Sequence, residues 1–105
     1  MAKMSTHRIE RQNLQRRFRG LLNDINRNLD YGRQAEHPAS ESVLSRFRSL
    51  ARRVRDWIKW LRDDDHVSLD NAWDYLERYK HRNDMLWREM ISDELHAWLW
   101  ADDSY

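Results

Sequence analysis

Apolar residues recur at steps of three and four along most of this chain, most clearly in residues 40–62. Alternating steps of four and three keep each set of side chains on one side of an α-helix. One set is an apolar stripe of Val43, Phe47, Leu50, Val54, Trp57 and Leu61. The opposite set becomes a basic stripe of Arg48, Arg52, Arg55, Lys59 and Arg62. The pattern predicts a helix with one core-facing side and one cationic side.

A second helix is predicted over residues 6–31. Its apolar face consists of Leu14, Phe18, Leu21, Leu22, Ile25 and Leu29. Ser5 or Thr6 is a suitable N-cap, and Gly32 is expected to end the helix in a left-handed conformation. The polar segment that follows contains the only proline, so we expect the chain to turn back there. The next helix then begins either at Pro38, capped by the preceding histidine, or at Ser40.

The third predicted helix covers residues 68–100, with Ser68 as its N-cap. Its apolar positions fall within an arc of roughly 160°, which is typical of a helix that packs against two others. A break at residues 83–84 or at residues 92–93 is the main alternative. Asn83 and Glu94 lie inside the apolar arc, where a polar residue either fixes the register or marks such a break. Glu94 is expected to pair with an arginine, and Arg11 is the candidate by composition.

Three long helices with short connections indicate an all-α fold, an antiparallel three-helix bundle with the third helix continuous or broken into two. The 105 residues with 2 Gly and 1 Pro predict a single helical domain over residues 1–105 with frayed termini. Helices of this length give a thin rod about 40 Å long. Such a rod has much surface for its mass. We therefore expect either a third helix that folds back on itself or a core completed by another chain.

Charge is divided along the chain. Residues 1–62 carry fifteen basic and six acidic side chains, residues 63–105 carry four and twelve, and the net charge is +1. Basic and acidic parts can therefore pair within one molecule or between molecules. Of the basic residues sixteen are arginine and three are lysine, which suits bidentate pairing with carboxylate or phosphate.

The predicted basic face combines two helices. It consists of Arg16, Arg19, Arg27, Arg48, Arg52, Arg55, Lys59 and Arg62. Such a face suits either phosphates of nucleic acid or an acidic protein. The alternatives are that the acidic third helix covers it, or that it is an ordinary solvated surface. No helix-turn-helix spacing is visible, so nucleic-acid binding would depend on phosphate contacts with low sequence specificity.

Six tryptophans are unusual in 105 residues. Trp57, Trp73, Trp87 and Trp98 lie on or at the edge of apolar arcs and are expected in the core or at its margin. Trp60 and Trp100 fall outside these arcs. We predict a partner-binding aromatic patch, or a C-terminus folded onto the bundle end, from Trp60, Trp98, Leu99 and Trp100.

No catalytic, cofactor-binding or metal-binding residue is predicted. The chain has no cysteine, so thiolate zinc sites and disulfides are excluded. The histidines recur without a chelating geometry, and two glycines are too few for a phosphate-binding loop. No apolar run reaches the roughly 20 residues of a membrane span, and a cytoplasmic protein is expected.

The predicted function is therefore binding without catalysis. The leading hypothesis is a helical inhibitor or adaptor that docks on a larger macromolecular partner, most readily a protein. In size and composition the chain resembles the small inhibitors that phages and mobile elements direct against host nucleic-acid-processing machinery, although no motif carries this resemblance. The alternatives are an arginine-rich nucleic-acid-binding protein and a structural homo-oligomer.

Overall fold

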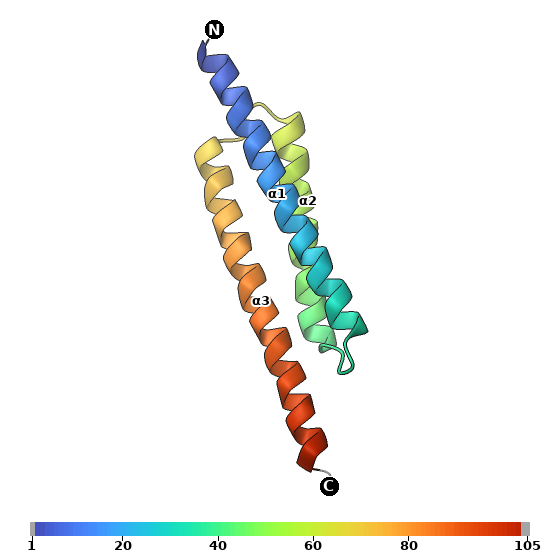
Figure 1. Ribbon diagram of the computed structural model, residues 1–105. Coiled ribbons are helices and arrows are strands. Elements are labelled where there is room, and N and C mark those ends of the chain that lie inside the picture. Colours follow the sequence, from blue (N-terminus) through green and yellow to red (C-terminus); the bar gives the residue numbers. More distant parts are fainter. Residues whose placement is uncertain (1, 104–105) are drawn as a thin grey trace.

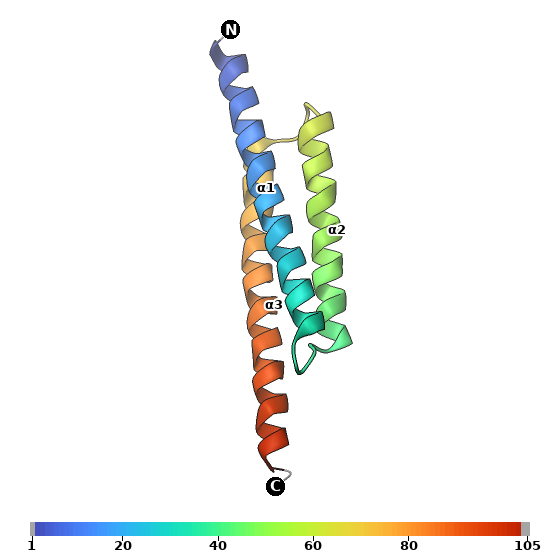
Figure 2. The ribbon, with the colours of Figure 1, turned by 45° about the vertical axis from the view of Figure 1, so that its right-hand side comes forward.

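The computed structural model describes the backbone of residues 2–103 and the side chains of residues 8–100. Over that range it forms three helices, α1 (Ala2–Gln34), α2 (Glu41–Asp63) and α3 (Leu69–Asp103). Figures 1 and 2 show that α1 and α3 run in one direction and that α2 runs in the opposite direction beside them. The all-α bundle of three helices is confirmed. Met1 and residues 104–105, for which fraying was predicted, lie outside the described residues.

α1 is longer than predicted at both ends. It begins at Ala2, ahead of both predicted N-caps, since no proline or glycine precedes them to stop a helix. It also continues through Gly32, and no glycine in the described backbone has a positive φ. The prediction that Gly32 is a left-handed cap is therefore wrong. A β-carbon there would lie 2.7 Å from Met90 Sδ and 3.1 Å from Leu44 Cδ2, so the missing side chain allows α2 and α3 to approach α1.

α2 begins where the Ser40 alternative places it. Ser40 is extended, with φ −61° and ψ 151°, and its Oγ accepts a hydrogen bond from the Val43 amide at 3.3 Å. At the other end the Asp64 amide donates to the Trp60 carbonyl at 2.8 Å. Ser40 thus satisfies one of the unpaired amides of the first turn.

α3 is one continuous helix, and neither predicted break is present. Ser68 Oγ accepts a hydrogen bond from the Asn71 amide at 3.4 Å, as expected of an N-cap. Asn83 is buried, and its Oδ1 accepts a hydrogen bond from Asn28 Nδ2 at 3.0 Å. The polar side chain in the apolar arc is therefore satisfied by α1, and the helix has no reason to break there.

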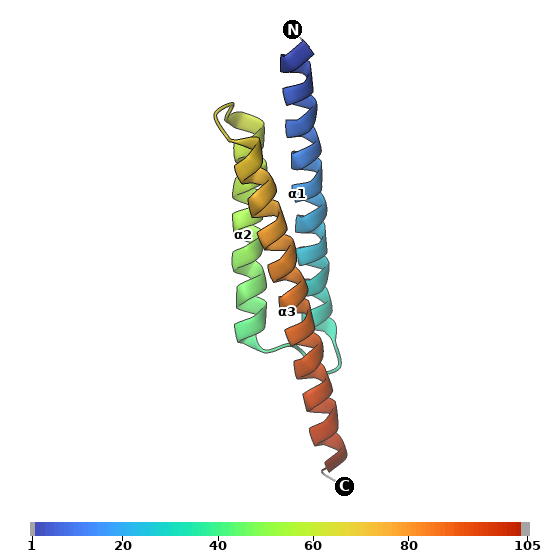
Figure 3. The same cartoon turned by 90° about the vertical axis from the view of Figure 1, so that its left-hand side faces the viewer.

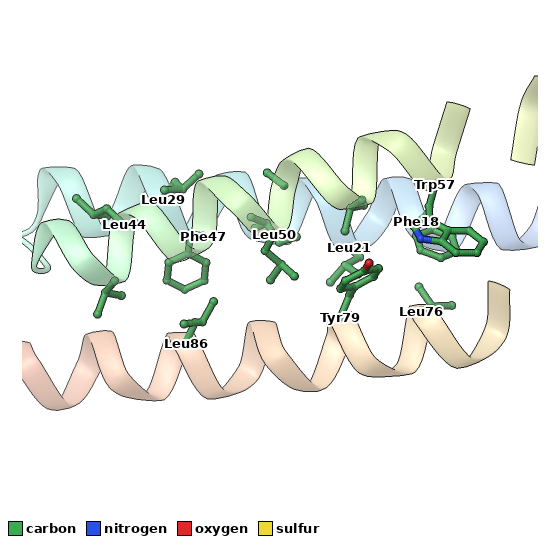
Figure 4. Close-up of a cluster of buried hydrophobic side chains, with 14 of the residues drawn as sticks. Phe18, Leu21, Leu29, Leu44, Phe47, Leu50, Trp57, Leu76, Tyr79 and Leu86 are labelled. Atoms are coloured by element: carbon green, nitrogen blue, oxygen red, sulfur yellow. The ribbon is translucent and has the colours of Figure 1, made fainter. Parts of the chain in front are cut away.

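The core is a single column of side chains along the bundle (Figure 4). All six residues of the predicted apolar stripe of α2 are buried. The side chains that face them from α1 and α3 are Leu14, Phe18, Leu21, Ile25, Leu29, Ala72, Leu76, Tyr79, Leu86 and Met90. Each fully buried Leu or Phe contributes roughly 1.5–3 kcal/mol through transfer from water, so this column holds the three helices together.

The molecule is a rod of 71 × 17 × 15 Å, longer than the predicted bundle. Its helices are staggered: the start of α1 extends past one end of α2, and the last turns of α3 extend past the loop that joins α1 to α2 (Figures 1 and 3). Both ends of the rod are therefore single helices. We call them the α1 end (residues 2–10) and the α3 end (residues 95–103).

Candidate interaction surfaces

The α3 end carries large apolar side chains that no other described element covers. The last contacts of α3 with the rest of the bundle include the Tyr31 hydroxyl, which donates to Glu94 Oε2 at 3.2 Å. Beyond this contact the exposed large hydrophobic residues are Leu95, Trp98, Leu99 and Trp100, of which Trp100 is 63% exposed. As far as Asp103 the chain continues as α3, so over the described residues the C-terminal segment does not fold onto the bundle end as predicted. Trp98 is exposed and does not lie at the core margin as predicted, because α3 has already extended past the end of α1 and the start of α2 at this residue.

The other tryptophans are distributed along the rod. Trp57 is buried, with its ring stacked on Phe18 at a centroid distance of 5.9 Å. Trp73 and Trp87 are half-buried, and the Arg17 guanidinium lies over the Trp73 ring at 5.0 Å. These three side chains are in the core or at its margin, as expected.

The structure does not bring Trp60 together with the α3 end. Trp60 is 47% exposed and packs edge-on against Trp57 at 5.4 Å, near the C-terminus of α2. That part of α2 lies beside the start of α3, at the opposite end of the rod from the last turns of α3 (Figures 1 and 2). The predicted aromatic patch is therefore two separate surfaces.

The basic stripe of α2 lies along α1, on the flank that faces away from α3. Arg48, Arg52 and Arg55, joined by Arg33 of α1, line a groove of about 540 Å³ in which Asp30 is the only carboxylate among the lining residues. Lys59 and Arg62 extend the stripe further along α2, and all five of its side chains are exposed.

Few local carboxylates neutralise this stripe. Arg48 pairs with Glu41 at 3.0 Å, and Arg62 pairs with Asp63 at 2.8 Å. Hydrogen bonding from Arg62 lowers the pKa of Asp63, as expected for this adjacent ion pair. Among the described side chains, Arg52 and Arg55 have no carboxylate within ion-pair distance.

The acidic helix does not cover the stripe. The one ion pair found between α2 and α3 in the described part joins Glu89 to Arg46, which lies on the other flank of α2. The alternative in which α3 covers the basic face is therefore wrong. α3 packs against the opposite flank because Phe47, Leu50 and Tyr79 bury their apolar surface there.

The predicted α1 members of the basic face are exposed but separate. Arg16 and Arg19 lie on the solvent side of α1. Arg27 lines a smaller hollow between α1 and α3 with Asp24 and Asp84, and its guanidinium lies 4.0 Å from Asp24. Arg27 is therefore not part of the groove between α1 and α2.

A second arginine-lined groove, which the sequence analysis did not identify, runs between α2 and α3. Its volume is about 740 Å³, and its lining residues include no carboxylate. Four arginines line it: Arg46 and Arg53 from α2, and Arg78 and Arg82 from α3. The sequence does contain a signal for this groove. Arg46 and Arg53 are seven residues apart, and Arg78 and Arg82 are four residues apart. Each spacing keeps the two arginines on one flank of their helix.

Two polar contacts differ from prediction. Arg11 does not meet Glu94; it donates to the carbonyls of Leu61 at 2.9 Å and of Asp64 at the C-terminus of α2. Glu94 accepts instead from Tyr31, at the other end of the rod. The reason is orientation, because α1 and α3 are parallel and early residues of one never meet late residues of the other. The hydrogen bond from Tyr31 to Glu94, together with the carboxylate charge, raises the pKa of Tyr31.

Comparison with protein families, with curated proteins and with solved structures finds no match for this chain. Within residues 2–103, none of the helices contains an apolar stretch long enough to cross a membrane.

Proposed function

We propose that this protein binds nucleic acid through the two arginine-rich flanks of α2, with little sequence specificity. The observation that carries this proposal is that the basic stripe remains exposed and only partly paired after α3 has packed. Arg52 and Arg55 are available in the groove beside α1, and Arg46 and Arg53 line the groove beside α3.

The chemistry of these flanks suits phosphate. Guanidinium groups bind phosphate in a bidentate manner, and they are always charged. From Arg48 to Arg62 the stripe extends about 21 Å along α2 at 1.5 Å per residue. A nucleic-acid strand in a duplex advances about 3.4 Å per nucleotide, so the stripe spans roughly six phosphates.

Trp60 adds a feature that favours nucleic acid over an acidic protein. It lies seven residues after Arg53, on the same flank of α2, and its indole is 47% exposed. Bases stack on exposed aromatic rings beside basic grooves, and this stacking tolerates any sequence. The sequence shows no helix-turn-helix spacing, which favours a phosphate-driven mode of binding.

The test is fluorescence anisotropy with labelled single-stranded and duplex DNA. If about four phosphates are contacted, Kd for a duplex should rise about 100-fold between about 50 mM and about 200 mM salt. The variant Arg52→Gln/Arg55→Gln should weaken binding and lower the salt slope by about two. Lys80→Gln/Arg88→Gln removes the same charge from α3 and is the matched control. Absence of binding to both DNAs at low salt contradicts the proposal.

We infer a second candidate function, protein binding, from the exposed α3 end. Leu95, Trp98, Leu99 and Trp100 offer the aromatic and aliphatic side chains that dominate binding hot spots. An inhibitor or adaptor, including one of the phage-encoded type, would insert this end into an apolar groove of a larger partner. Trp98→Ala and Trp100→Ala should abolish capture of that partner while helix content is unchanged. Equal capture of the same partner by both variants would exclude this role.

A further inference from the structure

We propose that the groove between α2 and α3 binds single-stranded nucleic acid in preference to a duplex. This inference rests on the proposed nucleic-acid binding and assigns the single strand to one of the two flanks of α2. It starts from a difference between the flanks. The groove beside α1 has no aromatic side chain and one carboxylate among the residues that line it, whereas the groove beside α3 has two tyrosines and no carboxylate.

The charge in the groove between α2 and α3 is available to an anion. Two arginines come from each wall, Arg46 and Arg53 from α2 and Arg78 and Arg82 from α3. Arg46 is paired with Glu89, but the other three guanidinium groups have no carboxylate within ion-pair distance among the described side chains. Guanidinium groups bind phosphate in a bidentate manner. Arginines on both walls therefore suit successive phosphates of one strand that lies between them.

Aromatic rings adjoin this groove near the C-terminus of α2. Trp57 is at their centre, with the Trp60 ring 5.4 Å and the Tyr75 ring 4.4 Å away between centroids. The Arg78 guanidinium lies over the Tyr75 ring at 5.5 Å. Trp57 is buried and Tyr75 is half-buried, whereas Trp60 is 47% exposed. Trp60 is therefore the ring on which a base can stack, and Trp57 holds it in place from behind.

Helical spacing places Trp60 in line with the arginines of α2. Arg46, Arg53 and Trp60 follow each other at seven residues, so they form one row in which each step is about 10.5 Å long. A strand with its nucleotides about 3.4 Å apart advances by roughly three nucleotides in each step. A strand with phosphates at Arg46 and Arg53 thus brings one of its next bases to Trp60.

A base reaches Trp60 only when it is unpaired. In a duplex the bases are stacked and paired on the inside, and flipping one out costs free energy. A single strand exposes its bases, and stacking on aromatic rings beside a basic groove is a common way to bind such strands without sequence preference. A duplex gains only phosphate contacts, which the exposed stripe beside α1 also offers. The aromatic ring therefore favours the single strand.

The experiment is fluorescence anisotropy of the full chain with a labelled oligothymidylate of about 12 nucleotides and a duplex of the same length. The wild type should bind the single strand more tightly than the duplex. Trp60→Ala should raise the Kd of the single strand roughly 5- to 150-fold, the range for one stacked base, and should leave the Kd of the duplex unchanged. Trp60→Phe keeps an aromatic ring and should lose less. Circular dichroism confirms that each variant is folded.

Charge is tested on the α3 wall. Arg78→Gln/Arg82→Gln should lower the salt slope of single-strand binding by about 1.4, since each phosphate contact on a single strand contributes about 0.7. Lys80→Gln/Arg88→Gln removes the same charge from α3 outside the groove and should leave this slope unchanged. ATP covers only part of the row from Arg46 to Trp60, so it should displace the strand only at a much higher concentration.

Equal Kd values of the wild type for single strand and duplex overturn the proposal, as does single-strand binding that neither Trp60→Ala nor Arg78→Gln/Arg82→Gln weakens. Duplex binding that Arg52→Gln/Arg55→Gln still weakens would then leave the proposed function intact and reject only the single-strand groove. Absence of binding to both DNAs at low salt rejects both proposals. ATP that binds as tightly as the strand would make a free nucleotide the ligand and also rejects the single strand.

Discussion

The two glycines of α1 should respond in opposite directions to the same substitution. Both lie inside the helix with ordinary backbone angles, so Gly→Ala should add about 1 kcal/mol of helix propensity at either position. At Gly20 a new β-carbon meets nothing within 4 Å. Gly20→Ala is therefore expected to raise the free energy of unfolding by about 0.5–1 kcal/mol.

At Gly32 the same methyl group would lie 2.7 Å from Met90 Sδ and 3.1 Å from Leu44 Cδ2. Met90 is 2% exposed, so its side chain cannot move aside into solvent. Insertion of a methyl group into a packed site costs about 1–3 kcal/mol, which exceeds the propensity gain. Gly32→Ala is expected to lower the free energy of unfolding by about 1 kcal/mol.

Urea unfolding followed by helix ellipticity measures both changes, with Gly20→Ala as the internal control. A gain of equal size at both positions would refute the close approach of α2 and α3 to Gly32. Gly32→Asn separates the two explanations for this glycine. Asparagine adopts the left-handed conformation readily, so a cap would tolerate it better than alanine. The packed helix predicts the reverse order, because asparagine is larger.

The polar contacts between helices give three further predictions. Asn83→Leu should lower the free energy of unfolding by about 1–3 kcal/mol because Asn28 loses its partner, and Asn28→Leu in the same chain should recover much of the loss in urea titrations. Arg11→Met should cost about 1–2 kcal/mol in the same assay, since the last carbonyls of α2 lose a charged donor. The pKa of Tyr31 should lie above its ordinary value of about 10 and should fall in Glu94→Gln, as followed by ring absorbance. Folding favours neutral Tyr31, so this contribution to stability is complete below the unfolded pKa and is lost as the pH rises through the raised pKa.

Features that depend on one helix were predictable from the sequence. The two stripes of α2 follow from helical periodicity alone, and the Ser40 cap is a local signal that needs no neighbour. Gly32 was wrongly predicted to be a helix cap. A glycine is needed at this position because side chains of α2 and α3 approach it closely, and these lie far from it in the sequence. A glycine near a helix end is more often a cap, and no local pattern reports a close approach from elsewhere.

Features that combine helices required their orientation and register. Arg78 and Arg82 belong to residues 63–105, where acidic side chains outnumber basic ones. They were therefore treated as part of an acidic helix and were not included in the predicted basic face. Only the packed register shows that they face Arg46 and Arg53 across one groove. The separation of Trp60 from the α3 end was, by contrast, implied by the antiparallel topology. The end of α2 must lie beside the start of α3, a full helix length from its last turn.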